Sequence, residues 1–361
     1  MASDEGSNLV DFVVSMGGEK SLRVEENFGD GFVKLRVSEA ERRQAQHDIR
    51  CIEDVVVEML RNARDAGARH IYVATYRDGD TRYLTMLDDG SGIPESMQDR
   101  VFDARVTSKL ESVHMDRWGV HGRGMALFSV RENAREARVV SSAPEKGSSI
   151  QVVTDATQLR ERADQSTWPS VGVDEDGNQA VTRGPHNIVR TCCEFALEER
   201  GRCEVYVGSP AEICATARRR VTPTVEGSAL LFIDSLEELP VLERLRAAAD
   251  ASELFSQATS LGLDMSERTA HRIVSGQVKP VRSVLSRLLH KSGGDAREVD
   301  LAKDRRGLQV SADDVEEFSR IMERGFAFLS ERYYLTLASD PKVRVTRGKV
   351  TVTFDIDEEG E

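Results

Sequence analysis

Three side chains that could act together on a ligand lie close in sequence in the segment Glu58–Ala68 (EMLRNARDAGA). Glu58, Asn62 and Asp65 are separated by four and then three residues, so in a helix they fall on one face. A carboxamide and a carboxylate one turn apart suit a hard cation such as Mg²⁺ and a water molecule held for attack. Surface helices often carry Glu and Asn at this spacing, so a plain surface helix is the favoured alternative for this segment taken alone.

A second polar motif, the segment Asp88–Gly92 (DDGSG), directly follows an apolar run at Tyr83–Leu87 that is expected to be a strand. Gly90 and Gly92 allow the backbone to turn sharply and to approach a ligand closely. The carboxylate of Asp88 can accept a hydrogen bond from an exocyclic amine such as the 6-amino group of adenine. A simple turn explains this motif equally well when it is taken by itself.

A third motif places Gly119, Gly122 and Gly124 before an apolar helix that is expected from Met125 to about Ala134. Glycines ahead of a helix leave backbone N–H groups and the positive end of the helix dipole open to a phosphate. The motif is not a Walker A loop, because no Gly-Lys-Ser/Thr sequence follows it.

The elements that must position these motifs follow from the spacing of apolar residues. Before residue 155 we expect strands at 9–14, 22–25, 32–37, 71–76, 83–87, 138–142 and 149–154, and helices at 38–52 and 54–66. Beyond it we expect helices at 187–200, 210–219 and 313–337, a strand at 203–207, helical segments throughout 239–289, and a hairpin at 343–354.

The order of the motifs resembles that of the GHKL superfamily, which includes gyrase, a heat-shock chaperone of the same fold, histidine kinases and MutL. Four motifs follow one another in the family's order over roughly residues 32–155. They are the Glu/Asn helix, the DxGxG turn, the GxxGxG segment and the residues Gly147–Ile150, which lead into a strand. Chance convergence is a minor alternative. The resemblance implies a Bergerat fold, which is a mixed sheet with helices on one face, and a site for ATP and Mg²⁺.

The resemblance also assigns roles by motif position. Glu58 is expected to be the general base that activates water, Asn62 the magnesium ligand, and Asp88 the adenine contact. The further nucleotide-binding residues that the resemblance implies are Asp65, Gly90, Gly92, Lys109, Gly119, Gly122, Gly124 and Ser149. Ser149 would help to hold the adenine through water, while Asp65 fits a helix-stabilising role equally well. The expected activity is Mg²⁺-dependent ATP hydrolysis.

Within the superfamily, the segment Thr107–Lys109 resembles a lid element of MutL and of the type IIB topoisomerase B subunit, in which Lys109 would meet the phosphates. A histidine kinase is disfavoured, because the candidate phosphorylated His47 lies too close to Glu58 for a separate dimerising module. These relatives add a transducer domain whose lysine touches the terminal phosphate. No such domain is evident here, and no choice is compelling among Lys279, Lys303, Lys342 and Lys349.

A helical segment further along resembles a helix-turn-helix, with its two helices at 253–263 and 266–276. Residues 264–292 carry six basic and two acidic side chains, although the whole chain has a net charge of −13. This local excess of positive charge predicts a candidate DNA surface over residues 256–291. A helical bundle that packs on its neighbours is the slightly favoured alternative.

The composition of the chain limits which classes of protein it can belong to. The chain has 361 residues, of which 39% are hydrophobic and 31% charged, as is usual for globular proteins of two or three domains. Its negative charge argues against a protein that coats nucleic acid through general electrostatics. No apolar run approaches the ~20 residues of a membrane helix, and the five cysteines show no CxxC pair that would indicate a zinc site. We expect a cytoplasmic protein without a membrane partner.

These observations predict an α+β chain built around a Bergerat-type sandwich. The expected parts are an N-terminal arm (1–31), a GHKL ATP-binding domain (32–155), a linker (156–184), a small α/β segment (185–235), a helical, helix-turn-helix-like module (236–294), and a C-terminal helix with a β-hairpin (310–361). Our hypothesis is that ATP closes a lid at about 103–124, promotes homodimerisation and controls an output module that binds DNA. The alternatives are a serine protein kinase of the anti-sigma type, which the extra C-terminal length disfavours, and a non-enzymatic, ATP-gated DNA-binding regulator.

Overall fold

The computed structural model describes residues 24–292 and 312–357, apart from residues 30, 108–113, 117–118, 122–123, 163, 174–178, 226–232, 234, 334–335 and 347–348. The chain divides into two compact units, Met1–Ser292 and Gly293–Glu361. The expected strand at 9–14 and the first part of the one at 22–25 lie outside the described residues.

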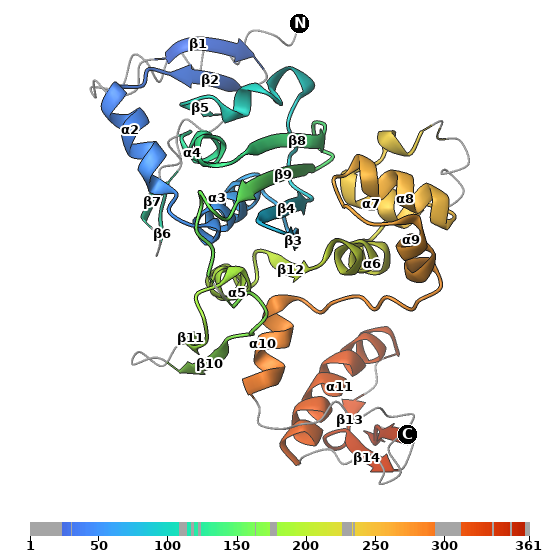
Figure 1. The fold of residues 1–361 in the computed structure, drawn as a ribbon. Coiled ribbons are helices and arrows are strands. Elements are labelled where there is room, and N and C mark those ends of the chain that lie inside the picture. Colours follow the sequence, from blue (N-terminus) through green and yellow to red (C-terminus); the bar gives the residue numbers. More distant parts are fainter. Residues whose placement is uncertain are drawn as a thin grey trace, which may run out of the picture. The chain divides into compact units, whose positions relative to one another are not determined.

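A five-stranded mixed sheet is the centre of the first unit (Figure 1). From one edge to the other its strands are β12 (Glu204–Gly208), β3 (His70–Asp78), β4 (Thr81–Asp88), β9 (Ser148–Asp155) and β8 (Glu136–Ser142). β12 runs parallel to β3, and the other neighbouring strands are antiparallel. Apolar residues of β3 and β4 are buried on both faces, so each face needs a covering layer.

The first face of the sheet is covered by α3 (Ile52–Asp65), α4 (Ala126–Asn133) and α5 (Ile188–Glu198), with α10 (Val284–Ser292) beside α5. The side of α3 that packs into this core carries apolar residues at helical spacing, namely Val55, Val56, Met59, Leu60 and Ala63. α3 ends where Gly67 adopts a φ of 77°. The polar side of the same helix is thereby left for the site described below.

The reverse face is covered by α6 (Pro210–Arg220), α7 (Val241–Ala247), α8 (Ala251–Ser260) and α9 (Glu267–Val274) (Figure 1). These helices bury Tyr72, Leu87 and Tyr206, which point away from the first core. The end of α8 is also hydrogen-bonded to the sheet, since Thr85 Oγ1 donates to the carbonyl of Gly262 at 2.8 Å and Gln151 Nε2 donates to it at 3.1 Å.

Within residues 32–155, α3 and α4 lie on one face of the mixed sheet, as expected, and further helices cover its reverse face. The second layer comes from residues beyond 155, which the family motifs do not reach. The expected segments 185–235 and 236–294 are likewise parts of one unit with the sheet, because β12 is its edge strand and α6–α9 are its second layer. The packing of α8 and α9 on the sheet agrees with the packed-bundle alternative, and the helix-turn-helix interpretation stays a prediction.

The N-terminal part of the first unit forms a separate three-stranded sheet of β1 (Val24–Gly29), β2 (Phe32–Leu35) and β5 (Val106–Thr107). α2 (Glu39–Asp48) follows, and its start is fixed by a capping box between Ser38 and Glu41. Shorter elements complete this region: η1 (Glu95–Met97), η2 (Arg100–Phe102), β6 (His114–Asp116) and β7 (Gly119–His121).

The segment expected to be a linker, 156–184, contains a hairpin of β10 (Ser170–Val173) and β11 (Gln179–Arg183) and is fastened to the sheet. Glu161 accepts hydrogen bonds from Arg82 Nε and Nη2, both at 2.9 Å. A short helix, η4 (Leu236–Glu238), precedes α7.

The second unit consists of α11 (Ala312–Tyr333), the hairpin of β14 (Lys342–Thr346) and β15 (Lys349–Thr353), and the pair β13 (Thr336–Leu337) and β16 (Ile356–Asp357). Phe326 of α11 stacks on Phe354 with ring centroids 5.1 Å apart. A helix and a hairpin lie here as the sequence predicted. Across both units, no helix among the described residues is long and apolar enough to cross a membrane.

Candidate functional site

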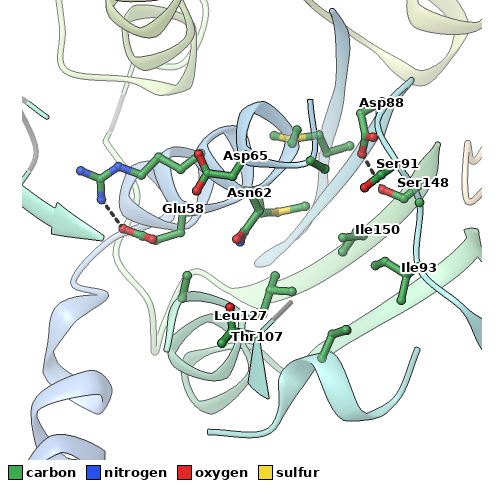
Figure 2. Close-up of a pocket in the computed structure, with 18 of the residues that line it drawn as sticks. Glu58, Asn62, Asp65, Asp88, Ser91, Ile93, Thr107, Leu127, Ser148 and Ile150 are labelled. Atoms are coloured by element: carbon green, nitrogen blue, oxygen red, sulfur yellow. Dashed lines mark hydrogen bonds and ion pairs between the residues drawn. The ribbon is translucent and has the colours of Figure 1, made fainter. Parts of the chain in front are cut away.

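A pocket opens between α3, the adjoining ends of β4 and β9, β5 and the start of α4 (Figure 2). Its empty volume is about 1100 Å³, counting the solvent-filled space at its opening. Its polar lining residues are Glu58, Arg61, Asn62, Asp65, Asp88, Ser91, Thr107 and Ser148. Its apolar lining includes Phe32, Met86, Ile93, Val106, Leu127 and Ile150. Six of the predicted residues, from three separate motifs, thus line one pocket: Glu58, Asn62, Asp65, Asp88, Gly92 and Gly124.

One end of the pocket is built around the buried carboxylate of Asp88, which is 4% exposed. The register of β4 and β9 sets Ser148 directly opposite Asp88, and Ser148 Oγ donates a hydrogen bond to Asp88 Oδ2 at 2.5 Å. The backbone amide of Gly90 donates to Asp88 Oδ1 at 2.8 Å. Burial raises the pKa of Asp88 to about 6, while these hydrogen bonds favour the ionised form and oppose the rise. The pocket therefore offers a carboxylate acceptor at neutral pH.

Glycines are required where the backbone crowds this end. Gly92 has a φ of 72°, and a Cβ atom on it would lie 1.9 Å from the carbonyl oxygen of Ala143. A Cβ atom on Gly90 would lie 2.8 Å from Asp88 Oδ1. At the mouth of α4, Gly124 has a φ of 66° and a Cβ atom there would lie 2.9 Å from the carbonyl oxygen of Val106. Any side chain at these positions would displace the walls of the pocket.

Figure 2 shows Asp88 and Glu58 at opposite ends of the pocket, with Asn62 between them. Asn62 Nδ2 is buried and has no hydrogen-bond partner among the described residues. A half-turn of the amide exchanges its oxygen and nitrogen, so this side chain can present either atom to a ligand. A buried polar atom without a partner is costly, and a ligand that bonds to Asn62 would remove that cost. The side chain therefore fits a polar ligand or a hydrated cation.

Two arginines of α3 hold the carboxylates of the same helix. Arg61 Nη1 lies 2.7 Å from Glu58 Oε1, and Arg64 Nε lies 3.0 Å from Asp65 Oδ1. Arg64 also reaches Glu199 at the end of α5, with Nη1 2.9 Å from Oε1. Asp65 is thus both part of the pocket wall and part of an ion-pair chain that joins α3 to α5, which agrees with the helix-stabilising alternative as well as with a binding role.

Ser149 does not lie in the pocket. Its side chain is fully buried on the reverse face of the sheet, where Oγ donates to the carbonyl of Leu261 at 2.8 Å. Successive residues of a strand point to opposite faces, so the hydroxyl in the pocket belongs to Ser148 instead. Ile150, two residues after Ser148, lines the pocket as well, so this alternation holds along the start of β9. Sequence reasoning also missed Phe32, Arg61 and Ser91.

Two predicted residues, Lys109 and Gly122, lie outside the described residues. Gly119 begins β7, which pairs with β6. The roles of these three residues stay predictions.

Residues 47–158 match the family model described as "Histidine kinase-, DNA gyrase B-, and HSP90-like ATPase". This segment is a GHKL domain. The GHKL domain contains α3, β3, β4, α4, β8 and β9, and every residue labelled in Figure 2 belongs to it.

Curated relatives place this GHKL domain near that of MutL. The DNA mismatch repair protein MutL of Thermus thermophilus is 39% identical over 84 residues, which is 23% of this chain and 15% of that protein. MutL of Acidiphilium cryptum is 36% identical over 107 residues, 29% of this chain and 18% of that protein. The chain therefore spans less than a fifth of the length of these relatives.

Among solved structures, the mycobacterial sensor histidine kinase MprB aligns with 34% of this chain and 75% of its own, at 21% identity and a TM-score of 0.21.

Proposed function

We propose that this protein is a Mg²⁺-dependent ATPase of the GHKL type. The observation that carries the proposal is the arrangement of one pocket inside the GHKL domain, with the buried Asp88–Ser148 pair at one end, Glu58 at the other and Asn62 between them. An acceptor, a metal ligand and a base in this order match the order of the base, the metal-bound phosphates and the attacking water of a nucleoside triphosphate site.

The Asp88 end suits adenine. The 6-amino group of the purine donates a hydrogen bond, and an ionised, buried carboxylate is a strong acceptor for it. Met86, Ile93 and Ile150 supply apolar walls for the ring. The glycines at 90 and 92 let the ring approach the backbone.

The middle of the pocket suits the phosphates and the metal. Asn62 would hold Mg²⁺ through its side-chain oxygen, with water and phosphate oxygens as the other ligands, a mode in which Mg²⁺ is often bound. When bound, the metal neutralises charge on the phosphates. Gly124 places the backbone at the start of α4 against the pocket, so that the positive end of this helix favours an anion.

The Glu58 end suits hydrolysis. Glu58 takes a proton from a water molecule as the water oxygen attacks the terminal phosphorus. The bond from that phosphorus to the bridging oxygen breaks, and ADP and inorganic phosphate are released. A carboxylate that is partly buried, at 21% side-chain exposure, is shielded from bulk water while it can still meet a bound one.

The test is calorimetry of the purified full chain with ATP, with and without Mg²⁺, together with phosphate release. We expect binding that requires Asp88 and hydrolysis that requires Glu58 and Mg²⁺. Absence of heat with ATP would overturn the proposal. Binding of ATP with transfer of labelled phosphate to a protein, and none to water, would favour the kinase alternative.

A second, wider proposal is that ATP-driven lid closure and homodimerisation control contact with DNA through residues 256–291. It is supported by the exposed basic side chains of α9 and of the segment that follows it, Arg268, Arg272 and Lys279. Gel shifts with and without ATP test it, using the double change Arg268→Glu and Arg272→Glu. Unchanged DNA affinity in that variant would remove the proposal, whereas the loss of a nucleotide-dependent shift would support it.

A further inference from the structure

The carboxylate of Glu58 is held by an arginine that belongs to the wall of the same pocket. Arg61 is only 4% exposed and follows Glu58 by three residues, so the two side chains lie on one side of α3. Arg61 Nη1 donates to Glu58 Oε1 at 2.7 Å, the contact drawn as a dashed line at Glu58 in Figure 2. This is a short, charge-assisted hydrogen bond between two residues that both line the pocket.

We propose that Arg61 is a positioning residue for Glu58, and that ATP hydrolysis depends on it while ATP binding does not. The proposal rests on the proposed function of Glu58 as the base. It concerns how that base is oriented, which no motif of the sequence indicated.

Two physical effects support this role. A glutamate side chain has three rotatable bonds, and a hydrogen bond from a buried guanidinium restricts its carboxylate to one direction, which a general base requires. The charge on the guanidinium also makes this hydrogen bond stronger than one between neutral groups, so it holds the carboxylate more firmly in place.

Stability alone is a weak explanation for the pair. Removing a guanidinium and a carboxylate from water costs energy that their attraction often does not repay, so an apolar pair would serve the fold equally well. A role in orienting the carboxylate of Glu58 explains the buried position of Arg61 better than a contribution to stability does.

A second arginine in the same unit provides a matched control. Arg82 is 7% exposed and binds Glu161 through Nε and Nη2, so it is also a buried arginine paired with a glutamate. It lies at the opposite end of β4 from Asp88 and does not line the pocket. Replacing Arg82 therefore tests what the loss of a buried Arg–Glu pair does to the fold alone.

The experiment compares full-length wild type with Arg61→Gln, Arg61→Lys, Glu58→Gln, the double variant Glu58→Gln/Arg61→Gln, and Arg82→Gln. ATP affinity is measured by calorimetry, kcat by phosphate release and thermal stability by melting. We expect Arg61→Gln to lower kcat by about ten- to a hundredfold, the range of a hydrogen bond to a charged group, with Kd changed less than about twofold. Arg61→Lys should regain part of kcat, because lysine restores the charge and one donor.

Two further comparisons separate positioning from folding. In the Glu58→Gln background, Arg61→Gln should lower kcat no further, because the residue it positions is already gone. Arg82→Gln should lower the melting temperature while kcat stays within about twofold of wild type.

A kcat of Arg61→Gln that equals or exceeds the wild-type value would overturn the proposal, since the arginine would then be neutral or would restrain the base. An Arg82→Gln variant that loses kcat to the same degree would also overturn it, since any buried pair would then matter alike. If Arg61→Gln does not fold, the Arg61→Lys variant provides the test. A wild-type kcat in Arg61→Lys would reject the positioning role, and a lowered kcat with an unchanged Kd for ATP would support it. If wild type binds ATP but does not hydrolyse it, the proposed ATPase function fails instead.

Discussion

Asp88 and Ser148 are direct partners across the antiparallel strands β4 and β9, and the hydroxyl of Ser148 donates to the buried carboxylate of Asp88. The register of two strands therefore places a charge and its stabilising donor in the same pocket. Burial raises the pKa of Asp88 to about 6, and the hydroxyl opposes that rise. The strength of the acceptor that the pocket offers thus depends on a neighbouring serine.

The two adjacent serines of β9 should behave differently. Ser148→Ala removes the donor to Asp88, and we expect ATP affinity near neutral pH to fall by about tenfold, as for the loss of one hydrogen bond to a charged group. Ser149→Ala is the matched control, because Ser149 bonds to Leu261 on the reverse face. It should cost about 1 kcal/mol of unfolding free energy and leave ATP affinity unchanged. Calorimetry and denaturant unfolding measure the two quantities, and equal affinities of both variants would contradict the prediction.

ATP affinity should fall as the pH drops through about 6, because protonated Asp88 no longer accepts a hydrogen bond from the adenine amine. The effect on stability has the opposite sign. The pKa of Asp88 is raised above its usual 3.8, so the folded protein binds the proton more tightly than the unfolded chain. This group's unfavourable contribution is fully present above about pH 6 and diminishes as the pH falls.

The phosphates of ATP titrate in the same range, so the pH series needs an internal reference. Ser148→Ala provides it, since loss of the hydroxyl should move the midpoint of the affinity curve to higher pH while leaving the titration of the phosphates unchanged. Superimposable curves for wild type and Ser148→Ala would show that Asp88 does not govern the dependence.

Glu58→Ala should leave ATP binding nearly intact and reduce hydrolysis by about 10²–10⁴-fold, the usual contribution of a general base. Asp88→Asn should instead remove ATP binding. Calorimetry combined with phosphate release separates the two effects. Normal hydrolysis by Glu58→Ala would show that another group is the base.

Magnesium should be needed for hydrolysis through Asn62. Removing divalent cations with a chelator should abolish phosphate release by wild type, and restoring Mg²⁺ should recover it. Asn62→Ala should need a higher Mg²⁺ concentration for half-maximal rate, because a side-chain ligand is missing. An unchanged Mg²⁺ requirement in Asn62→Ala would place the metal elsewhere.

Gly92→Ala should destabilise the protein more than Gly79→Ala does. Both glycines have positive φ values, 72° and 56°, so both variants bear the cost of a left-handed residue, about 1–2 kcal/mol. Only at Gly92 would the added Cβ atom collide with a backbone atom, the carbonyl oxygen of Ala143, whereas nothing lies within 4 Å at Gly79. Melting temperatures compare the two, and equal shifts would contradict the steric explanation.

Much of the site follows from local sequence because its residues sit in short motifs. The spacing of Glu58 and Asn62 alone places them on one face of a helix. The glycines that follow Asp88 mark it as a motif residue. Such features depend on neighbours in the chain, which the sequence displays directly. The same holds for the β14–β15 hairpin, which was expected around the Arg347–Gly348 pair.

What the sequence did not predict depends on pairing between distant strands and layers. The choice between Ser148 and Ser149 is decided by the register of β9 against β4. β12 joins the sheet beside β3 although more than a hundred residues separate them in the chain. Arg61 was passed over because an arginine on an amphipathic helix usually faces solvent, whereas here the pocket wall buries it.

The double covering of the sheet sets a lower limit on the length of chain that can fold alone. A fragment that stopped at residue 158, where the family match ends, would lack α6–α9 and leave Tyr72 and Leu87 facing water. Such a bare apolar sheet face favours self-association. The smallest fragment of this chain that folds by itself and contains the pocket should therefore reach to about Ser292, the end of the first compact unit.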